Sequence, residues 1–190
     1  MKKKMIFALI AAAILTVCAG CSKKADTPDV PKDLFASLDT VDFEGNRVTA
    51  DVFKENDLTV INTWATWCGP CVGEIPELQE LSEELKQEGT KVAIKGMVAE
   101  DGEKGLQAGL SENERTLVKE VLSKTGATYQ QLLVSEDLAI SALSRQAGFP
   151  TTYFVDSEGQ LVGDPVMFSQ DKDGWRKVIE ERLKEVTHES

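Results

Sequence analysis

Two cysteines that separate a strand-like run from a helix-like run constrain the fold of this chain more than any other feature. Residues 58–64 read LTVINTW, a near-continuous apolar run that is typical of a strand buried on both faces. Residues 71–86 have helical spacing instead. Their apolar positions on one face are Val72, Ile75, Leu78, Leu81 and Leu85. A buried strand that leads through Cys68 and Cys71 into a helix predicts an α/β domain.

The position of the two cysteines suggests their chemistry. Cys68 and Cys71 are three residues apart at a helix start, so their sulfurs can reach each other. Cys68 lies at the helix end, where free N–H groups and the helix dipole favour a thiolate, the attacking species in disulfide exchange. Cys71 lies further into the helix, where it is more shielded, and is suited to resolving the mixed disulfide that the first cysteine forms. Pro70 fits the first helical turn because it has no N–H to leave unpaired.

Composition and charge exclude other classes of protein. The chain has 190 residues, of which 42% are hydrophobic and 28% charged, and a net charge of −11. These values fit one soluble globular domain and argue against binding to nucleic acid. A zinc site would need a second cysteine pair or paired histidines. His188 is the only histidine, and the only other cysteines, Cys18 and Cys21, lie in the N-terminal segment. A purely structural disulfide would constrain the unfolded chain little, because it spans three residues.

The N-terminus has the pattern of an export signal. Three lysines at positions 2–4 precede an apolar run over residues 5–19, which is shorter than a membrane span. The end of the run resembles a bacterial lipobox, with cleavage before Cys21 and lipid on that cysteine, although Cys18 occupies a position that is usually Leu. We therefore expect a signal peptide over residues 1–20. Its removal takes away three lysines and no acid, which changes the net charge from −11 to −14.

The rest of the chain is expected to be a short tether followed by one domain. Residues 22–32 are polar with two prolines, so we expect the lipidated cysteine and its tether over residues 21–33 and the domain over residues 34–188. Alternation and turn residues predict a hairpin over residues 35–49. Further strands are expected at residues 92–98, 129–134, 151–156 and 161–168, and helices at residues 111–124, 136–146 and 171–186. This order suits one mixed sheet with helices on both faces.

Three motifs together resemble a known family. They are VINTWATWCGPC at residues 60–71, VGEIPEL at residues 72–78 and GFPTT at residues 148–152. The chain is similar in these motifs to the membrane-anchored TlpA/ResA-like thiol-disulfide oxidoreductases of the thioredoxin superfamily. The resemblance implies a thioredoxin-like, three-layer α/β/α fold. It also implies an N-terminal β-hairpin and an insertion, placed here at about residues 100–127.

The resemblance also implies roles for individual residues. Cys68 would be the nucleophile and Cys71 the resolving cysteine, with no other cofactor and no metal. Pro150 matches the family's cis-proline, which faces the cysteine pair, and the backbone of Phe149 would pair with an extended substrate. The substrate-contacting set is Trp67, Gly69, Pro70, Phe149 and Pro150.

An acid near the pair is expected on the helix instead of the strand. Asn62 occupies the position at which thioredoxin has a buried acid, and an amide cannot titrate. In the ResA-like branch a Glu three residues after the second cysteine lies near the pair, and Glu74 matches it. Glu74 is one helical turn beyond Cys71, so the two side chains share a face. A carboxylate there would raise the thiol pKa values and could accept a proton from Cys71, unless Glu74 is simply a solvated helix residue.

The direction of electron flow is predicted from the two residues between the cysteines. Gly69-Pro70 is the dipeptide found between the cysteines of thioredoxin. The reduction potential of thioredoxin is about −270 mV, against about −120 mV for the oxidant DsbA. We therefore expect a lipid-anchored reductase at the extracytoplasmic face of the cell membrane. The resemblance implies a CcdA/DsbD-type membrane donor, and exported substrates such as apocytochrome c or methionine sulfoxide reductase.

Other functions remain open at this point. The pair could instead form disulfides as an oxidant, or only stabilise a non-enzymatic lipoprotein. A peroxidase of the peroxiredoxin type would have Pro-x-x-x-Thr/Ser-x-x-Cys, and copper delivery would need Cys-x-x-x-Cys with a distant His. The residues around Cys68 and Cys71 match neither of these last two patterns.

Overall fold

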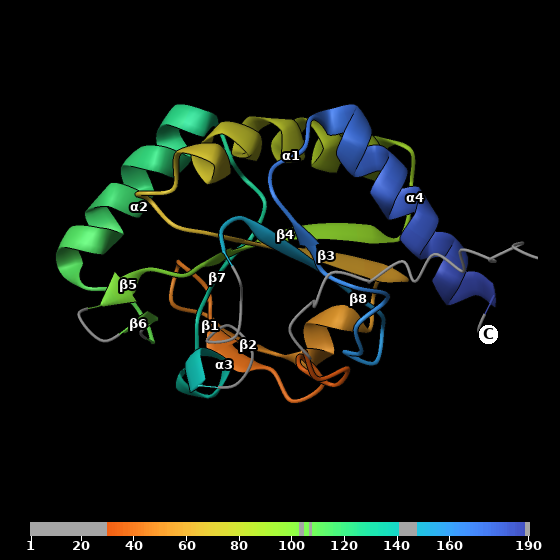
Figure 1. The fold of residues 1–190 in the computed structure, drawn as a ribbon, viewed down its shortest axis with the longest axis horizontal. Helices are drawn as coiled ribbons and strands as arrows, with labels where there is room; N and C mark the ends of the chain where they lie inside the picture. Colours follow the sequence, from red (N-terminus) through yellow and green to blue (C-terminus); the bar gives the residue numbers. More distant parts are fainter. Residues whose placement is uncertain (1–29, 103–104, 107, 141–147, 189–190) are drawn as a thin grey trace, which may run out of the picture.

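The computed structural model describes residues 30–102, 105–106, 108–140 and 148–188. The predicted signal peptide, Cys21 and most of the tether lie outside the described residues. The core of the fold is a mixed five-stranded sheet in the order β7-β4-β3-β8-β9 (Figure 1). Its strands are β3 (Leu58–Trp64), β4 (Val92–Val98), β7 (Gln131–Leu133), β8 (Thr151–Val155) and β9 (Val166–Met167).

The central strand β3 has a parallel neighbour on one side and an antiparallel neighbour on the other. It pairs in parallel with β4 and antiparallel with β8, and β4 pairs in parallel with β7. All seven residues of β3 are buried, as its apolar sequence predicts. Because β3 ends at Trp64, the residues that follow it emerge at the carboxyl end of the parallel strands.

Helices and a hairpin cover the two faces of the sheet. The helices α1 (Gly69–Gln87), α2 (Glu112–Thr125) and α4 (Lys172–His188) lie together on one face (Figure 1). The opposite face carries the strands β1 (Asp39–Val41) and β2 (Arg47–Thr49), which form the predicted hairpin. It also carries the 3-10 helix η1 (Ala50–Phe53) and the short helix α3 (Glu136–Ile140).

The two faces of the sheet contribute to two cores. Leu58, Val60 and Trp64 of β3 pack into the core beneath the three long helices. Ile61 points the other way, into the core beneath the hairpin. In that core the rings of Phe35 and Tyr153 meet edge-on, with their centroids 5.6 Å apart. This alternation follows from the two-residue period of a strand.

The segment predicted as an insertion forms a separate two-stranded sheet and a helix. After β4 come the two-residue strands β5 (Asp101–Gly102) and β6 (Gly105–Leu106). The helix α2 then begins with a capping box between Ser111 and Glu114, which satisfies free N–H groups at the helix start. Because α2 links two adjacent parallel strands, β4 and β7, it is a crossover helix.

One predicted strand is wrong over most of its length, and one predicted helix is seen only in part. The strand expected at residues 161–168 is reduced to β9 and an isolated bridge between Leu161 and Val155. Gly163 has a positive φ of 66°, and a proline follows at position 165, so the ladder is interrupted between them. The helix expected at residues 136–146 is α3 as far as Ile140, and residues 141–147 lie outside the described residues.

Residues at the end of the expected tether contact the domain. The Lys32 carbonyl accepts a hydrogen bond from the Leu161 N–H at 2.7 Å, and Val30 packs against the hairpin-side core. Val30 and Lys32 therefore contact the domain. In the part of the chain that the structure describes, no helix is both long enough and apolar enough to span a membrane.

Candidate active site

The two cysteines lie at the start of α1, directly after β3. They form a disulfide with a Cα–Cα distance of 5.3 Å. Cys68 is the N-cap of α1, and its sulfur accepts a hydrogen bond from the Cys71 N–H at 3.3 Å. Cys68 is 5% exposed and Cys71 is fully buried. Cys68 is therefore the one of the two with exposed surface, and it lies where the helix dipole favours a thiolate.

An aromatic pair lies beside the disulfide. The Trp67 ring is 55% exposed and contacts the Phe149 ring edge-on, with the ring centroids 5.4 Å apart. The Phe149–Pro150 peptide bond is cis, and Pro150 immediately precedes β8. Since Thr63 of β3 pairs with Thr151 of β8, the proline segment and the cysteine segment emerge at the same end of two adjacent strands. Gly69 and Pro70 are exposed in the first turn of α1.

The Glu74 side chain is buried next to the cysteine-bearing turn. It is 2% exposed, which excludes the alternative of a solvated helix residue. Its carboxylate accepts hydrogen bonds from three groups: Asn62 Nδ2 at 2.9 Å, Trp175 Nε1 at 3.1 Å and the Gln170 N–H at 3.3 Å. Burial raises the pKa of Glu74 above its usual value, and the three donors act in the opposite direction.

Asn62 connects the carboxyl group of Glu74 to the strand that follows the cis-proline. Besides its bond to Glu74, the Asn62 amide donates to Thr152 Oγ1 on β8 at 3.0 Å. Asn62 lies in the middle of β3 and is fully buried. The strand position that carries an acid in thioredoxin therefore holds and orients an acid that comes from the helix.

The loop before Cys68 is fixed by groups from β4 and β7. The Thr66 N–H donates to Glu100 Oε1 at 2.7 Å, and Glu100 is 4% exposed just after β4. The Trp64 indole N–H donates to Gln131 Oε1 on β7 at 2.9 Å. Gly96 of β4 leaves the space that the Gln131 side chain fills, because an added Cβ would overlap its amide.

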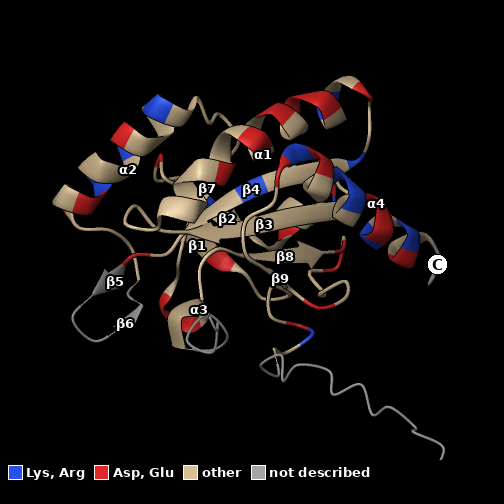
Figure 2. Cartoon of the chain, turned by 45° about the horizontal axis from the view of Figure 1, so that its top comes forward, with Lys and Arg blue, Asp and Glu red and all other residues tan. Residues whose placement is uncertain are grey.

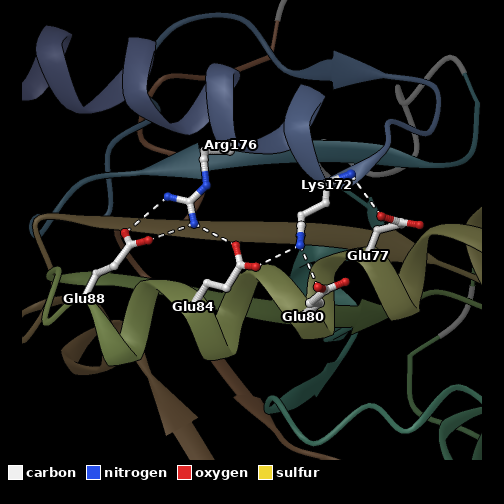
Figure 3. A network of polar contacts seen from close by, with 6 residues as sticks. All are labelled: Glu77, Glu80, Glu84, Glu88, Lys172 and Arg176. Atoms are coloured by element: carbon white, nitrogen blue, oxygen red, sulfur yellow. Dashed lines mark hydrogen bonds and ion pairs between the residues drawn. The ribbon is translucent and has the colours of Figure 1, made fainter.

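Acidic residues on α1 bind the first turns of α4 (Figure 3). Lys172 Nζ contacts Glu80 at 2.6 Å and Glu84 at 2.8 Å, and Arg176 contacts Glu84 at 2.8 Å and Glu88 at 3.0 Å. The Lys172 N–H also donates to a Glu77 oxygen at 3.1 Å. This set of contacts fixes α4 along α1.

The sequence located the reactive groups but not the residues that support them. The apolar spacing of residues 171–186 is typical of core packing for Trp175, which also donates to Glu74. Gln170, Glu100 and Gln131 were not identified, although an acid that directly follows a buried strand is a usable signal for Glu100. Among the described residues, no group of three or more His, Cys, Asp and Glu side chains is arranged to hold a metal ion.

The fold and the cysteine pair define a class of protein. The structure resembles the crystal structure of StoA from Bacillus subtilis, with a TM-score of 0.55 at 15% identity over 74% of this chain and 93% of that chain. This likeness shows a thioredoxin-like fold. With the cysteine pair at disulfide distance at the start of α1, the domain belongs to the class of thioredoxin-like folds that carry a cysteine pair able to form a disulfide.

Sequence comparison gives the family. The chain belongs to the Redoxin family, whose model matches residues 22–171. It is 28% identical over 97 residues to the thiol-disulfide oxidoreductase ResA of Bacillus cereus, which is 48% of this chain and 55% of the relative. It is 26% identical over 171 residues to the thiol:disulfide interchange protein DsbE of Haemophilus influenzae, which is 85% of this chain and 84% of the relative. The matches to the first curated relatives span about half of their length.

Proposed function

We propose that this protein is a lipid-anchored reductase of disulfides in exported proteins. The observation that carries the proposal is the arrangement of the pair, with Cys68 slightly exposed at the helix start and Cys71 fully buried one helical turn before a buried acid, Glu74. The substrate is a disulfide in an exported protein, with apocytochrome c or methionine sulfoxide reductase as candidates. A CcdA/DsbD-type membrane protein supplies the electrons.

The reaction is two successive thiol-disulfide exchanges. The Cys68 thiolate attacks one sulfur of the substrate disulfide, and the other substrate sulfur leaves as a thiolate that takes up a proton. Cys71 then loses its proton, and its thiolate attacks the Cys68 sulfur and releases the second substrate thiolate. The substrate gains two electrons, and the protein is left with the Cys68–Cys71 disulfide. During the exchange, Trp67, Gly69 and Pro70 on one side and Phe149 and Pro150 on the other contact the substrate.

Glu74 acts in the second exchange. Its buried carboxylate shares a helix face with Cys71 and accepts the proton that the Cys71 thiol must lose. The same negative charge raises the pKa of the thiols, which favours bond formation and a reducing pair. Glu74→Gln should therefore lower the thiol pKa values and slow resolution of the mixed disulfide. Unchanged thiol pKa values and an unchanged exchange rate would remove Glu74 from the mechanism.

The reduction potential decides the direction. It is measured by equilibrating residues 22–190 with a dithiol buffer of known potential. A value near about −270 mV, that of thioredoxin, is expected for a dedicated reductant. A value near about −120 mV, that of DsbA, would overturn the direction and make this protein a disulfide-forming oxidant.

A non-enzymatic role for the disulfide is tested separately. In that case the disulfide only stabilises a binding surface. Cys68→Ser should abolish disulfide exchange while the circular dichroism spectrum stays that of the folded protein. Cellular function that persists in Cys68→Ser would support the non-enzymatic alternative.

The membrane anchor is part of the same proposal. Lipid on Cys21 and the short tether keep the pair near its membrane donor, since a lipoprotein carries the two or three acyl chains that stable anchoring needs. Cys21→Ser should release the protein from the membrane fraction of cells. A variant that remains membrane-bound would exclude anchoring through Cys21.

A further inference from the structure

Phe168 combines strong exposure with an unfavourable backbone conformation. The side chain is 72% exposed, the highest value among the exposed large hydrophobic residues of the described chain. Its φ is +73°, and it is the only described residue other than glycine with a positive φ. A bulky side chain in this region costs free energy, and such conformations cluster at binding sites. Neither packing nor backbone preference explains why Phe occupies this position.

The backbone of Phe168 is bound to the cis-proline. Its N–H donates to the Pro150 carbonyl at 3.1 Å. This bond continues the β8–β9 ladder, in which Thr151 pairs with Met167, so Phe168 lies in register with Pro150. The segment that carries Phe168 is therefore placed by the same residue that marks the edge of the redox site.

Two exposed aromatic residues therefore flank the segment of the cis-proline. Trp67 precedes Cys68, and its ring contacts Phe149, while Phe168 is paired through its backbone with Pro150, the residue after Phe149. Disulfide exchange requires a partner sulfur at Cys68, so the chain on either side of that sulfur must cross this surface. The occupant of the surface is therefore the polypeptide that carries the reacting cysteine.

The charge pattern indicates the chemistry of that polypeptide. Charged residues make up 28% of the chain, yet residues 58–73, 148–155 and 165–170 contain none. The helices α1, α2 and α4 carry many of the lysine, arginine, aspartate and glutamate residues (Figure 2). An uncharged aromatic surface inside an acidic molecule favours an apolar contact over an ion pair.

We propose that Phe168 determines specificity by binding, together with Trp67 and Phe149, a large apolar side chain next to the reacting cysteine of an extended substrate. The inference rests on the proposed role of Cys68 as the attacking cysteine. It does not depend on whether the protein reduces or forms disulfides, because both directions pass through the same mixed disulfide.

The test uses Cys71→Ser protein, in which exchange stops at the mixed disulfide. Two peptides are compared that differ only in Phe or Asp next to their single cysteine, which carries a thionitrobenzoate group. The Cys68 thiolate attacks the peptide sulfur and releases coloured thionitrobenzoate, so the rate constant is read directly. We expect a rate constant at least tenfold higher for the Phe peptide, since burial of one aromatic side chain is worth that factor.

Substitutions at position 168 should remove the preference. In both Phe168→Ala and Phe168→Gly we expect the ratio of the two rate constants to fall about tenfold, to near one. Phe168→Gly should also raise the midpoint of thermal unfolding by about 2–4 °C, because glycine adopts a positive φ without strain. The matched control is Leu117→Ala on α2, which removes another exposed apolar side chain and should keep the wild-type ratio.

Two results would overturn the proposal. One is a ratio that stays at its wild-type value in Phe168→Gly. The other is an equal loss of rate with both peptides, which would mean that Phe168 only supports the fold of the site. Failure of the proposed reductase function appears elsewhere, as an oxidising potential of the Cys68–Cys71 pair, and leaves the peptide preference unchanged.

Discussion

At the scale of single residues, the Glu74 carboxyl group is buried with hydrogen-bond donors and without a cation. Asn62, Gln170 and Trp175 donate to it, and the structure gives it no salt bridge among the described residues. Neutral donors offset only part of the desolvation of a carboxylate, so the pKa of Glu74 stays above its usual value. A buried acid of this kind makes the stability of the protein depend on pH.

The pH dependence has a definite sign. In the unfolded chain Glu74 loses its proton near its ordinary pKa of 4.5, whereas the folded protein holds that proton to higher pH. The free energy of unfolding should therefore fall as the pH rises from 4.5 through the raised pKa. Urea unfolding at several pH values should show this fall in the wild type and not in Glu74→Gln. Parallel curves for the two proteins would contradict it.

The tight packing of Gly96 against Gln131 near the site predicts that a larger residue at position 96 destabilises the fold. An added Cβ on Gly96 would overlap the Gln131 amide and displace the acceptor of the Trp64 indole N–H. Gly96→Ala should lower the free energy of unfolding by about 1–3 kcal/mol, as overpacking of a core does. Gly73→Ala is the matched control, because Gly73 lies in α1 with open space around it. There alanine should stabilise the helix by about 0.5–1 kcal/mol; denaturant titration measures both.

Sequence spacing identifies the reactive groups because they are local. Cys68, Cys71 and Glu74 lie within seven consecutive residues, and helical periodicity alone predicts that Glu74 shares a face with Cys71. The donors to Glu74 are distant, since Gln170 is 96 residues away along the chain and Trp175 is 101. Only the folded arrangement of β3, α1 and α4 reveals them.

At the scale of elements, the contact between α1 and α4 holds the redox helix in place. Glu84 lies between Lys172 and Arg176, and these cations hold the pKa of Glu84 below its usual value. The contribution of these ion pairs to the free energy of unfolding is therefore present above the ordinary pKa of 4.5. It is lost as the pH falls through the lowered pKa of Glu84. Because α4 also supplies Trp175 to Glu74, the alignment of the two helices reaches the site.

Removal of one cation should have an effect that depends on salt. Lys172→Met deletes the contacts to Glu80 and Glu84, so we expect a lower urea midpoint at low salt. The difference from the wild type should shrink at 1 M salt, where the Debye length is about 3 Å. The control Lys124→Met removes one exposed ion pair, with Glu120 at 3.5 Å. It should change the urea midpoint little at either salt concentration. An effect of Lys172→Met that is equal at both salts would point to lost packing instead.

Elements were predictable where their pattern is long and uninterrupted. β3 and β4 match their predicted bounds because both are buried apolar runs. The strand expected at residues 161–168 fails because apolar residues at its ends hide the break at Gly163. The positive φ of Phe168 could not be predicted at all, since aromatic residues rarely adopt it.

At the scale of the whole molecule, redox state and folding are coupled. If the folded protein favours the disulfide more than the unfolded chain does, then by the same free energy the oxidised protein resists unfolding more than the reduced one. About 1.4 kcal/mol of this difference corresponds to about 30 mV of potential. DsbA is a strong oxidant because its reduced form is the stabilised one, so a reductant should show the opposite order.

We therefore expect reduction to destabilise this protein. Reduction leaves Cys71 as a fully buried thiol beside the buried carboxyl of Glu74, and that carboxylate disfavours a second negative charge. Urea unfolding of the oxidised and the reduced protein should give the higher midpoint for the oxidised form. A double variant with Cys68→Ser and Cys71→Ser should have one midpoint, unaffected by reductant. A reduced form that is more stable than the oxidised form would place the protein with the oxidants, whatever its Gly69-Pro70 dipeptide suggests.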